Sequence, residues 1–250
     1  LYHTLTSPEC GIGLKRGVIP IYIAVIFSVI IAMVFALKKQ SRGTRRRAAE
    51  TVINLAFGMY ILDFFLMPLA YGEIDLEKLP FHMCTLMCLL SYLSYRGLLF
   101  KKYRKQFALL GLVSNLIYVI YPAGVGWYQI HPLSYRVVQT LLFHGAMTAY
   151  GILTLVLGDD KLTFKSSHLE LPVIAVVTLW AILGNTLYNG AAGEYDHFFN
   201  WFFVVRDPFY ILPEDIAPYI MPFIMILVIY AADLLIYGAY FAIKNAAVRK

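Results

Sequence analysis

The stretch "VIPIYIAVIFSVIIAMVFALKKQSRGTRRR", residues 18 to 47, sets about 20 apolar residues directly before six basic side chains. A helix of that length spans the hydrocarbon core of a bilayer, and basic residues are typical of the loop that follows on the cytoplasmic side. The rest of the chain is similar, because 60% of its 250 residues are hydrophobic and only 14% are charged. Its mean hydropathy of +0.68 reflects more apolar surface than one soluble domain can bury. The sequence therefore predicts an integral membrane protein.

Seven apolar runs are long enough to predict membrane-spanning helices. Neither a repeat nor a low-complexity segment divides the chain, so we expect a single domain over residues 1 to 250. The predicted fold class is all-α, a polytopic bundle of about seven transmembrane helices. The spans run roughly over residues 18 to 37, 48 to 71, 80 to 99, 107 to 124, 136 to 158, 170 to 191 and 214 to 243.

The basic residues predict an orientation, because short loops rich in Lys and Arg stay on the cytoplasmic side. Four segments on one side hold six, five, two and three basic residues, which makes sixteen of the 21 Lys and Arg residues. The other side holds five, together with the acidic stretch "GEIDLE". We therefore expect the N-terminus outside and the C-terminus in the cytoplasm, in a bacterial plasma membrane or, in a eukaryote, the endoplasmic reticulum.

The net charge of +6 does not point to nucleic acid, because the basic residues lie in short clusters between apolar runs. The three cysteines, Cys10, Cys84 and Cys88, offer neither a disulfide framework nor a CxxC metal pair. The first apolar run lacks a small-residue cleavage site, so we expect it to be retained as a span. The longest irregular segment, Ala192 to Pro213, is rich in aromatic residues and predicts an interfacial loop or a cap over a cavity.

Polar residues inside spans are costly and are candidates for function. With the predicted orientation, several of them fall in the outer half of the bilayer, where they predict a polar pocket, whereas Asp233 falls near an inner end, where water is close. An alternative role for the asparagines is hydrogen bonding between helices. The outer set comprises Asp63, Cys84, Asn115, Tyr118, His144, Asn185 and Asn189.

A cysteine and a histidine in this set suggest acyl transfer. Pro80 suits the first helical position, which puts Cys84 in the first turns, where the helix dipole favours a thiolate. His82 is two residues away and would point to a different face, so His144, at the same depth, is the candidate base. An imidazole that takes the thiol proton allows the thiolate to attack an ester carbonyl. A small buried hydrophobe is the competing interpretation of either Cys84 or Cys88.

Three motifs carry a resemblance to a known family. "LPFHMC" at residues 79 to 84, "QTLLFHG" at 139 to 145 and "FNWFFVVRDP" at 199 to 208 resemble the YwaF-like integral membrane proteins. That group includes vertebrate transmembrane phospholipid acyltransferases. The likeness covers roughly Tyr60 to Tyr240 and implies the helical membrane scaffold and, in the acyltransferase branch, activity on phospholipid acyl chains.

The resemblance also implies roles for individual residues. Cys84 and His144 match the cysteine and histidine held to be catalytic in the acyltransferase branch, and His82 matches the motif histidine beside the cysteine. Asn200 and Pro208 match the third motif. Trp201 stands where tyrosine is expected and "RDP" departs from the usual basic version, so this third motif matches the family pattern only in part.

Three functions follow as hypotheses. The first is a membrane lipid acyltransferase or lipid-remodelling enzyme, with Cys84 as nucleophile, His144 as general acid and base, and supporting residues for positioning. The second is a non-enzymatic carrier or lipid-binding subunit that uses the same polar pocket. The third is a metal site of His82, Cys84 and His144, for which the spacing is not diagnostic. We expect no cofactor and no nucleic acid, membrane phospholipids as partners, and another membrane protein or a second copy as a further partner. The supporting or substrate-binding residues are His82, Asp63, Asn115, Asn185 and Asn200.

Overall fold

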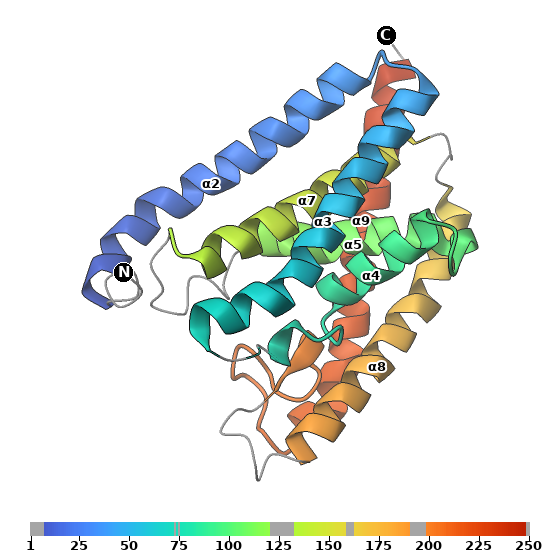
Figure 1. The fold of residues 1–250 in the computed structure, drawn as a ribbon. Coiled ribbons are helices and arrows are strands. Elements are labelled where there is room, and N and C mark those ends of the chain that lie inside the picture. The colour runs from blue at the N-terminus through green and yellow to red at the C-terminus, as the bar shows by residue number, and fades with distance from the viewer. Residues whose placement is uncertain are drawn as a thin grey trace. The chain divides into compact units, whose positions relative to one another are not determined.

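The computed structural model describes residues 8 to 72, 74, 76 to 120, 133 to 158, 163 to 190 and 199 to 248. This part of the chain contains seven α-helices and no strand, so the all-α prediction is confirmed (Figure 1). Each helix coincides with one predicted apolar run. The helices are α2 (Pro8–Leu37), α3 (Arg42–Tyr71), α4 (Met83–Tyr95), α5 (Arg104–Ile120), α7 (Tyr135–Leu157), α8 (Glu170–Gly190) and α9 (Ala217–Val248).

Five segments are long and apolar enough to cross a membrane, rather than the seven predicted, counted over the described residues. They are Val18–Leu37, Arg42–Leu69, Tyr135–Leu157, Phe164–Asn189 and Ala217–Ala242. The other two helices are shorter, with 13 residues in α4 and 17 in α5. The predicted topology therefore stays a prediction.

Helix α4 is shorter than the predicted span of residues 80 to 99 because glycine ends it. Gly97 takes a φ of 71°, a left-handed conformation that costs glycine little. The N–H of Leu98 then donates to the carbonyl of Leu93 at 2.9 Å, and the N–H of Gly97 donates to that of Ser94 at 3.2 Å. These two bonds form a Schellman motif, which ends the helix at Tyr95, before the apolar pattern ends.

The chain forms two compact units. Unit 1 comprises Leu1–Asp63 and Ser91–Asp160, and unit 2 comprises Phe64–Leu90 and Lys161–Lys250. Each unit is described by itself below. The single domain predicted over residues 1 to 250 stays a prediction.

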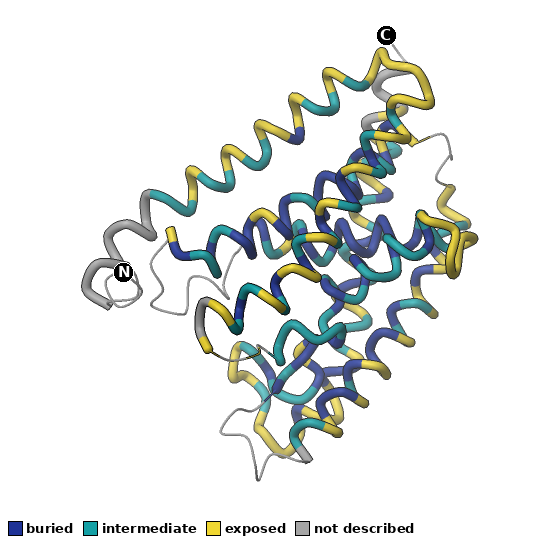
Figure 2. The backbone as a smooth tube through the Cα atoms, viewed as in Figure 1, coloured by how far each residue is buried: buried dark blue, intermediate teal, exposed yellow. Residues whose placement is uncertain are grey.

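Helices α5 and α7 form the core of unit 1, where most of their residues are buried (Figure 2). Gly151 of α7 lies against α5 so closely that a Cβ there would be 2.5 Å from Leu112 Cβ and 3.0 Å from the carbonyl oxygen of Ala108. Small residues allow such close approach of helix backbones in membrane proteins. Glycine at position 151 therefore sets the spacing of this pair.

Helix α2 contacts α7 but leaves most of its apolar surface exposed. Its contact passes over Gly145, where a Cβ would lie 3.1 Å from the Ile26 side chain. Phe35 is 62% exposed and Ile21 59% exposed, on a span with a mean hydropathy of 2.8. An apolar helix that buries so little against protein requires an apolar solvent, which supports its place in a bilayer.

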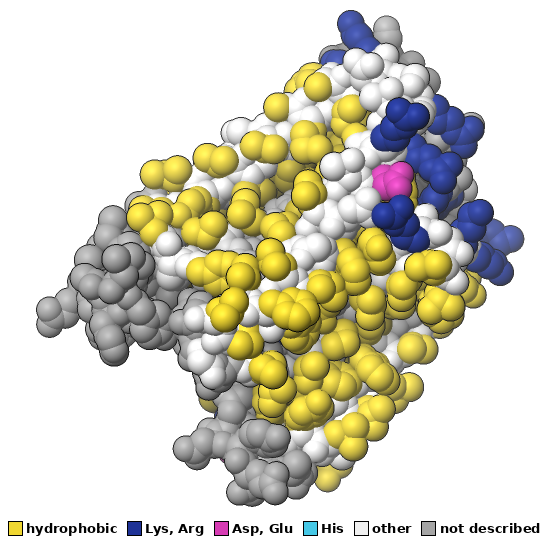
Figure 3. Space-filling model, in the orientation of Figure 1, with side chains coloured by type: hydrophobic (Ala, Val, Ile, Leu, Met, Phe, Trp, Pro, Cys, Tyr) yellow, Lys and Arg dark blue, Asp and Glu magenta, His cyan; other side chains and the backbone are white. Residues whose placement is uncertain are grey.

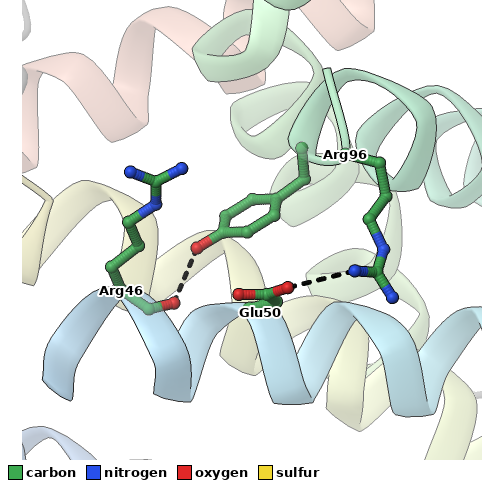
Figure 4. Close-up of polar contacts among 4 residues, drawn as sticks. Arg46, Glu50 and Arg96 are labelled. Atoms are coloured by element: carbon green, nitrogen blue, oxygen red, sulfur yellow. Dashed lines mark hydrogen bonds and ion pairs between the residues drawn. The ribbon is translucent and has the colours of Figure 1, made fainter. Parts of the chain in front are cut away.

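Polar contacts in unit 1 join the start of α3 to the end of α4 (Figure 4). The Tyr95 hydroxyl donates to the carbonyl of Arg46 at 2.6 Å, and Arg96 pairs with Glu50 at 3.2 Å. Figure 3 shows a face on which Lys and Arg side chains gather together and hydrophobic side chains cover much of the remainder.

In unit 2, an aromatic cluster lies between α8 and the segments before α4 and after α8. The Phe81 ring lies 4.8 Å from Trp201 and 5.2 Å from Trp180, measured between ring centroids. Gly184 of α8 lies directly under Phe81, where a Cβ would overlap the ring. The cluster fixes the chain immediately ahead of the "HMC" residues.

Candidate functional site

The predicted site residues divide between the two units. Asp63, Asn115 and His144 lie in unit 1, and His82, Cys84, Asn185 and Asn200 lie in unit 2. The prediction that they line one polar pocket stays a prediction.

His144 is buried in α7 and held in one orientation. Its Nδ1 lies 2.7 Å from the carbonyl oxygen of Thr140, and because a carbonyl only accepts, Nδ1 is the donor. The Tyr118 ring of α5 stacks on the imidazole with centroids 3.8 Å apart and planes 15° apart. In the neutral ring the proton is therefore on Nδ1, and Nε2 carries the lone pair that a general base needs.

The other two predicted residues of unit 1 are also buried. Asp63 accepts a hydrogen bond at 2.8 Å from the hydroxyl of Tyr135, in the first turn of α7. Asn115 donates to the carbonyl of Gly111 at 2.7 Å, one turn back on α5, while its Oδ1 has no hydrogen-bond partner. A buried amide oxygen without a donor costs free energy, which favours a polar ligand or water beside it.

Cys84 occupies the first turn of α4, as predicted, although the helix begins at Met83 and not at Pro80. The carbonyl of His82 accepts the first helical hydrogen bond, from Leu86 N–H, and also a bond from the side-chain hydroxyl of Thr85. Cys84 is partly exposed, whereas Cys88, one turn on, is fully buried. The two cysteines therefore differ in exposure, and Cys84 is the more exposed residue. The side chain of Cys10 lies outside the described residues.

His82 contacts the segment after α8 and not the thiol. The N–H of Phe202 donates to its Nδ1 at 3.2 Å, so Nδ1 carries no proton and Nε2 carries the proton of the neutral ring. Phe202 and Phe203 have φ of 58° and 53°, a left-handed conformation that is strained for aromatic residues. His82 thus helps to hold a strained turn next to the start of α4.

Two asparagines of α8 hold the same segment. Asn185 donates to the carbonyl of Trp201 at 3.0 Å and accepts from its N–H at 2.9 Å. Asn189, one turn on, does the same with Phe199 at 2.8 and 2.9 Å. Each amide therefore satisfies both the N–H and the carbonyl of one residue in this segment.

Asn200 has a local role. Its Oδ1 accepts from the N–H groups of Val205 and Arg206, each at 3.1 Å, and its Nδ2 donates to the carbonyl of Arg206 at 2.8 Å. These bonds close the turn that contains the two left-handed phenylalanines. Asn200 and Asn185 therefore shape the loop through backbone contacts.

Asp207 organises the loop beyond this turn, outside the predicted spans. Its buried carboxylate accepts the N–H groups of three following residues at 2.8 to 2.9 Å. The bond from Phe209 contributes most to a lowered pKa of this carboxyl, followed by that from Leu212, while burial opposes them. The carboxylate is therefore ionised while the loop is folded.

Sequence patterns did not single out the partners of these groups. Three side chains donate hydrogen bonds, through a hydroxyl or an indole group, to residues far along the chain: Tyr135, Trp180 and Trp201. Trp180 Nε1, for example, donates to the carbonyl of Pro80 at 2.8 Å. The only sequence signal here is the spacing of Asn185 and Asn189, which puts both on one helix face. Throughout the described residues, no group of three or more His, Cys, Asp and Glu side chains could hold a metal ion.

Comparison with protein families matches residues 12 to 241 to one family model. The chain belongs to the TMEM164 family. This is a transmembrane protein family, and together with the apolar helices it makes the chain a membrane protein. The YwaF-like name suggested by the motifs stays a prediction beside this membership. Comparisons with curated proteins and with solved structures found no match.

Proposed function

We propose that this TMEM164-family protein transfers acyl chains between membrane lipids, with Cys84 as nucleophile and His144 as general acid and base. The observation that carries the proposal is the exposure of Cys84 together with the hydrogen bonding of His144. Cys84 is a partly exposed residue in the first turn of a helix, and His144 donates its Nδ1 proton to a carbonyl, so that the lone pair of the neutral ring is on Nε2.

The proposed reaction has two balanced halves. His144 Nε2 takes the Cys84 thiol proton, and the thiolate attacks the ester carbonyl of a phospholipid. A thioester forms as the ester C–O bond breaks, and the leaving lysolipid oxygen takes the proton from the imidazolium. An acceptor hydroxyl then gives its proton to Nε2 and attacks the thioester, and the released thiolate recovers that proton.

The decisive experiment is acyl transfer by purified protein in lipid nanodiscs, with a phospholipid labelled in its acyl chain and an unlabelled lysophospholipid. We expect transfer by the wild type and a hydroxylamine-sensitive acyl adduct on Cys84 by mass spectrometry. Cys84→Ala and His144→Ala should each lose most of the activity, and the double variant little more, because groups that share one step are non-additive. Cys88→Ala is the matched control and should keep it, since that thiol is fully enclosed.

A second experiment tests whether the two side chains meet. In a chain without Cys10 and Cys88, His144→Cys should form a disulfide with Cys84 under mild oxidation, because bridging requires Cα atoms within about 7 Å. The same chain with Cys88 kept in place of Cys84 is the control and should not crosslink. Lipid binding without transfer, together with absence of the disulfide, would contradict the mechanism and favour the carrier or lipid-binding function.

A further inference from the structure

A second polar cluster in unit 2 lies between η3 (Phe164–Leu169), α8 and α9. It comprises Glu170 at the first position of α8, Asp233 and Tyr237 one turn apart on α9, and Ser166 of η3. Glu170 is 1% exposed, and both Asp233 and Tyr237 are 0% exposed. From sequence, Asp233 is expected near water; the structure instead encloses it.

The two carboxylates are poorly satisfied. Tyr237 donates its hydroxyl to Glu170 Oε1 at 2.9 Å, and the same hydroxyl lies 3.1 Å from Ser166 Oγ. Glu170 Oε2 and both oxygens of Asp233 have no hydrogen-bond partner among the residues that the structure describes. Three buried carboxylate oxygens without a donor would cost several kcal/mol, which favours a bound ion or water beside them.

The charges of Glu170 and Asp233 also favour a bound ligand. Asp233 lies within electrostatic range of Glu170 and of Tyr237, and the three are the titratable groups that act on one another here. No Lys, Arg or His among the described residues forms an ion pair with either carboxylate. Two like charges in a low-dielectric interior are relieved either by a positive charge between them or by uptake of a proton.

We propose that Glu170 and Asp233 bind a hard divalent cation of the Mg²⁺ or Ca²⁺ class between α8 and α9. These ions prefer oxygen ligands, and one Mg²⁺ is often held by one or two carboxylates with water completing its shell. Its two charges neutralise both side chains. Tyr237 is a positioning residue, because it fixes the Glu170 carboxylate through its hydroxyl. The ion would tie α8 to α9 and so stabilise unit 2.

The test is thermal unfolding of the chelator-treated full chain in detergent, with MgCl₂, CaCl₂ or NaCl at matched ionic strength. We expect a saturating rise in melting temperature, on the order of 5 °C, with Mg²⁺ or Ca²⁺ only. Asp233→Asn and Glu170→Gln should abolish the rise, while Asp215→Asn, a change at an exposed carboxylate of the same unit, should keep it. Equilibrium dialysis of the wild type with elemental analysis should give about one ion per chain.

Several results would overturn the proposal. In the unfolding experiment, they are a rise in melting temperature that persists in both carboxyl variants, an equal rise with NaCl, or a melting temperature that follows pH and does not respond to either divalent ion. In the dialysis experiment, the contradicting result is the absence of a bound ion. The dialysis uses only the wild type, so it decides the question even if a variant fails to fold. Failure here leaves acyl transfer by Cys84 untouched, because that activity is measured with different variants.

Discussion

The Tyr118 ring of α5 lies flat against the His144 imidazole of α7, with centroids 3.8 Å apart, while Thr140 holds Nδ1 of the same ring. Two independent contacts therefore fix one imidazole, the first through its face and the second through its edge. This is what a positioned base needs, since orientation counts as much as basicity.

Removing the Tyr118 ring should release His144. Tyr118→Ala should lower the free energy of unfolding by about 2 kcal/mol, because it deletes a half-buried ring and an aromatic pair. If His144 is the base, acyl transfer should fall as well. Tyr118→Phe keeps the stacked ring and is the control. Thermal unfolding and the nanodisc assay measure both effects, and equal behaviour of the Ala and Phe variants would argue against the stack.

A methyl group at Gly151 should separate α5 from α7. Gly151→Ala places Cβ 2.5 Å from Leu112 Cβ, which cannot rotate away, so we expect a loss of about 1 to 3 kcal/mol. Gly58→Ala is the matched control, because Gly58 lies within α3 with no atom inside 4 Å of the new Cβ. That variant should be neutral or slightly stabilising. The comparison uses melting temperatures in detergent, and similar losses in both variants would refute the close packing.

Breaking one asparagine pairing should loosen the loop over residues 199 to 206. Asn185→Leu leaves the N–H and carbonyl of buried Trp201 without partners, at a cost of about 1 to 3 kcal/mol. Hydrogen exchange followed by mass spectrometry should show faster exchange in this loop. Thr186→Leu is the control, because Thr186 is the next residue of α8 and its side chain is exposed. Unchanged exchange in Asn185→Leu would contradict the role of this two-bond pairing in holding the loop.

The loop around Asp207 should depend on acid. The folded-state pKa of this carboxyl is lowered by hydrogen bonds from Phe209 first and then Leu212, against burial. Its contribution to stability is therefore complete above the unfolded pKa of about 4 and is lost as pH falls through the lower folded value. We expect exchange over residues 207 to 212 to accelerate only below about pH 4. Asp207→Asn should remove this acid dependence, and a transition near neutral pH would contradict the assignment.

The predicted orientation can be tested by labelling. In a chain without native cysteines, Ile74→Cys should react with an impermeant reagent on intact cells, and Ser41→Cys should react only after permeabilisation. Both positions are exposed, so access to the reagent depends on the side of the membrane. The reason is the excess of basic residues on the side of Ser41. The opposite pattern would reverse the topology.

The sequence by itself determined the helices. Apolar runs of about 20 residues predict helices because a backbone in hydrocarbon must satisfy its own hydrogen bonds, and each of the seven runs coincides with a helix. Helix ends were less predictable, because local hydrogen bonds set them. Gly97 closes α4 through two backbone bonds, and His82, not Pro80, caps its start. Burial in lipid also makes intramembrane polar residues conspicuous, which is why His144 and Asn115 were found.

Only the tertiary structure decided what those polar groups contact. The tautomers of His82 and His144 depend on partners at residues 202 and 140, and the role of Asn185 depends on Trp201, sixteen positions away. Asp233 shows the same point. Its predicted depth in the bilayer places it near water, whereas the packing of α8 against α9 encloses it beside Glu170. Hydropathy reports how much a segment avoids water, whereas a hydrogen bond depends on distances between atoms that only the packed chain brings together.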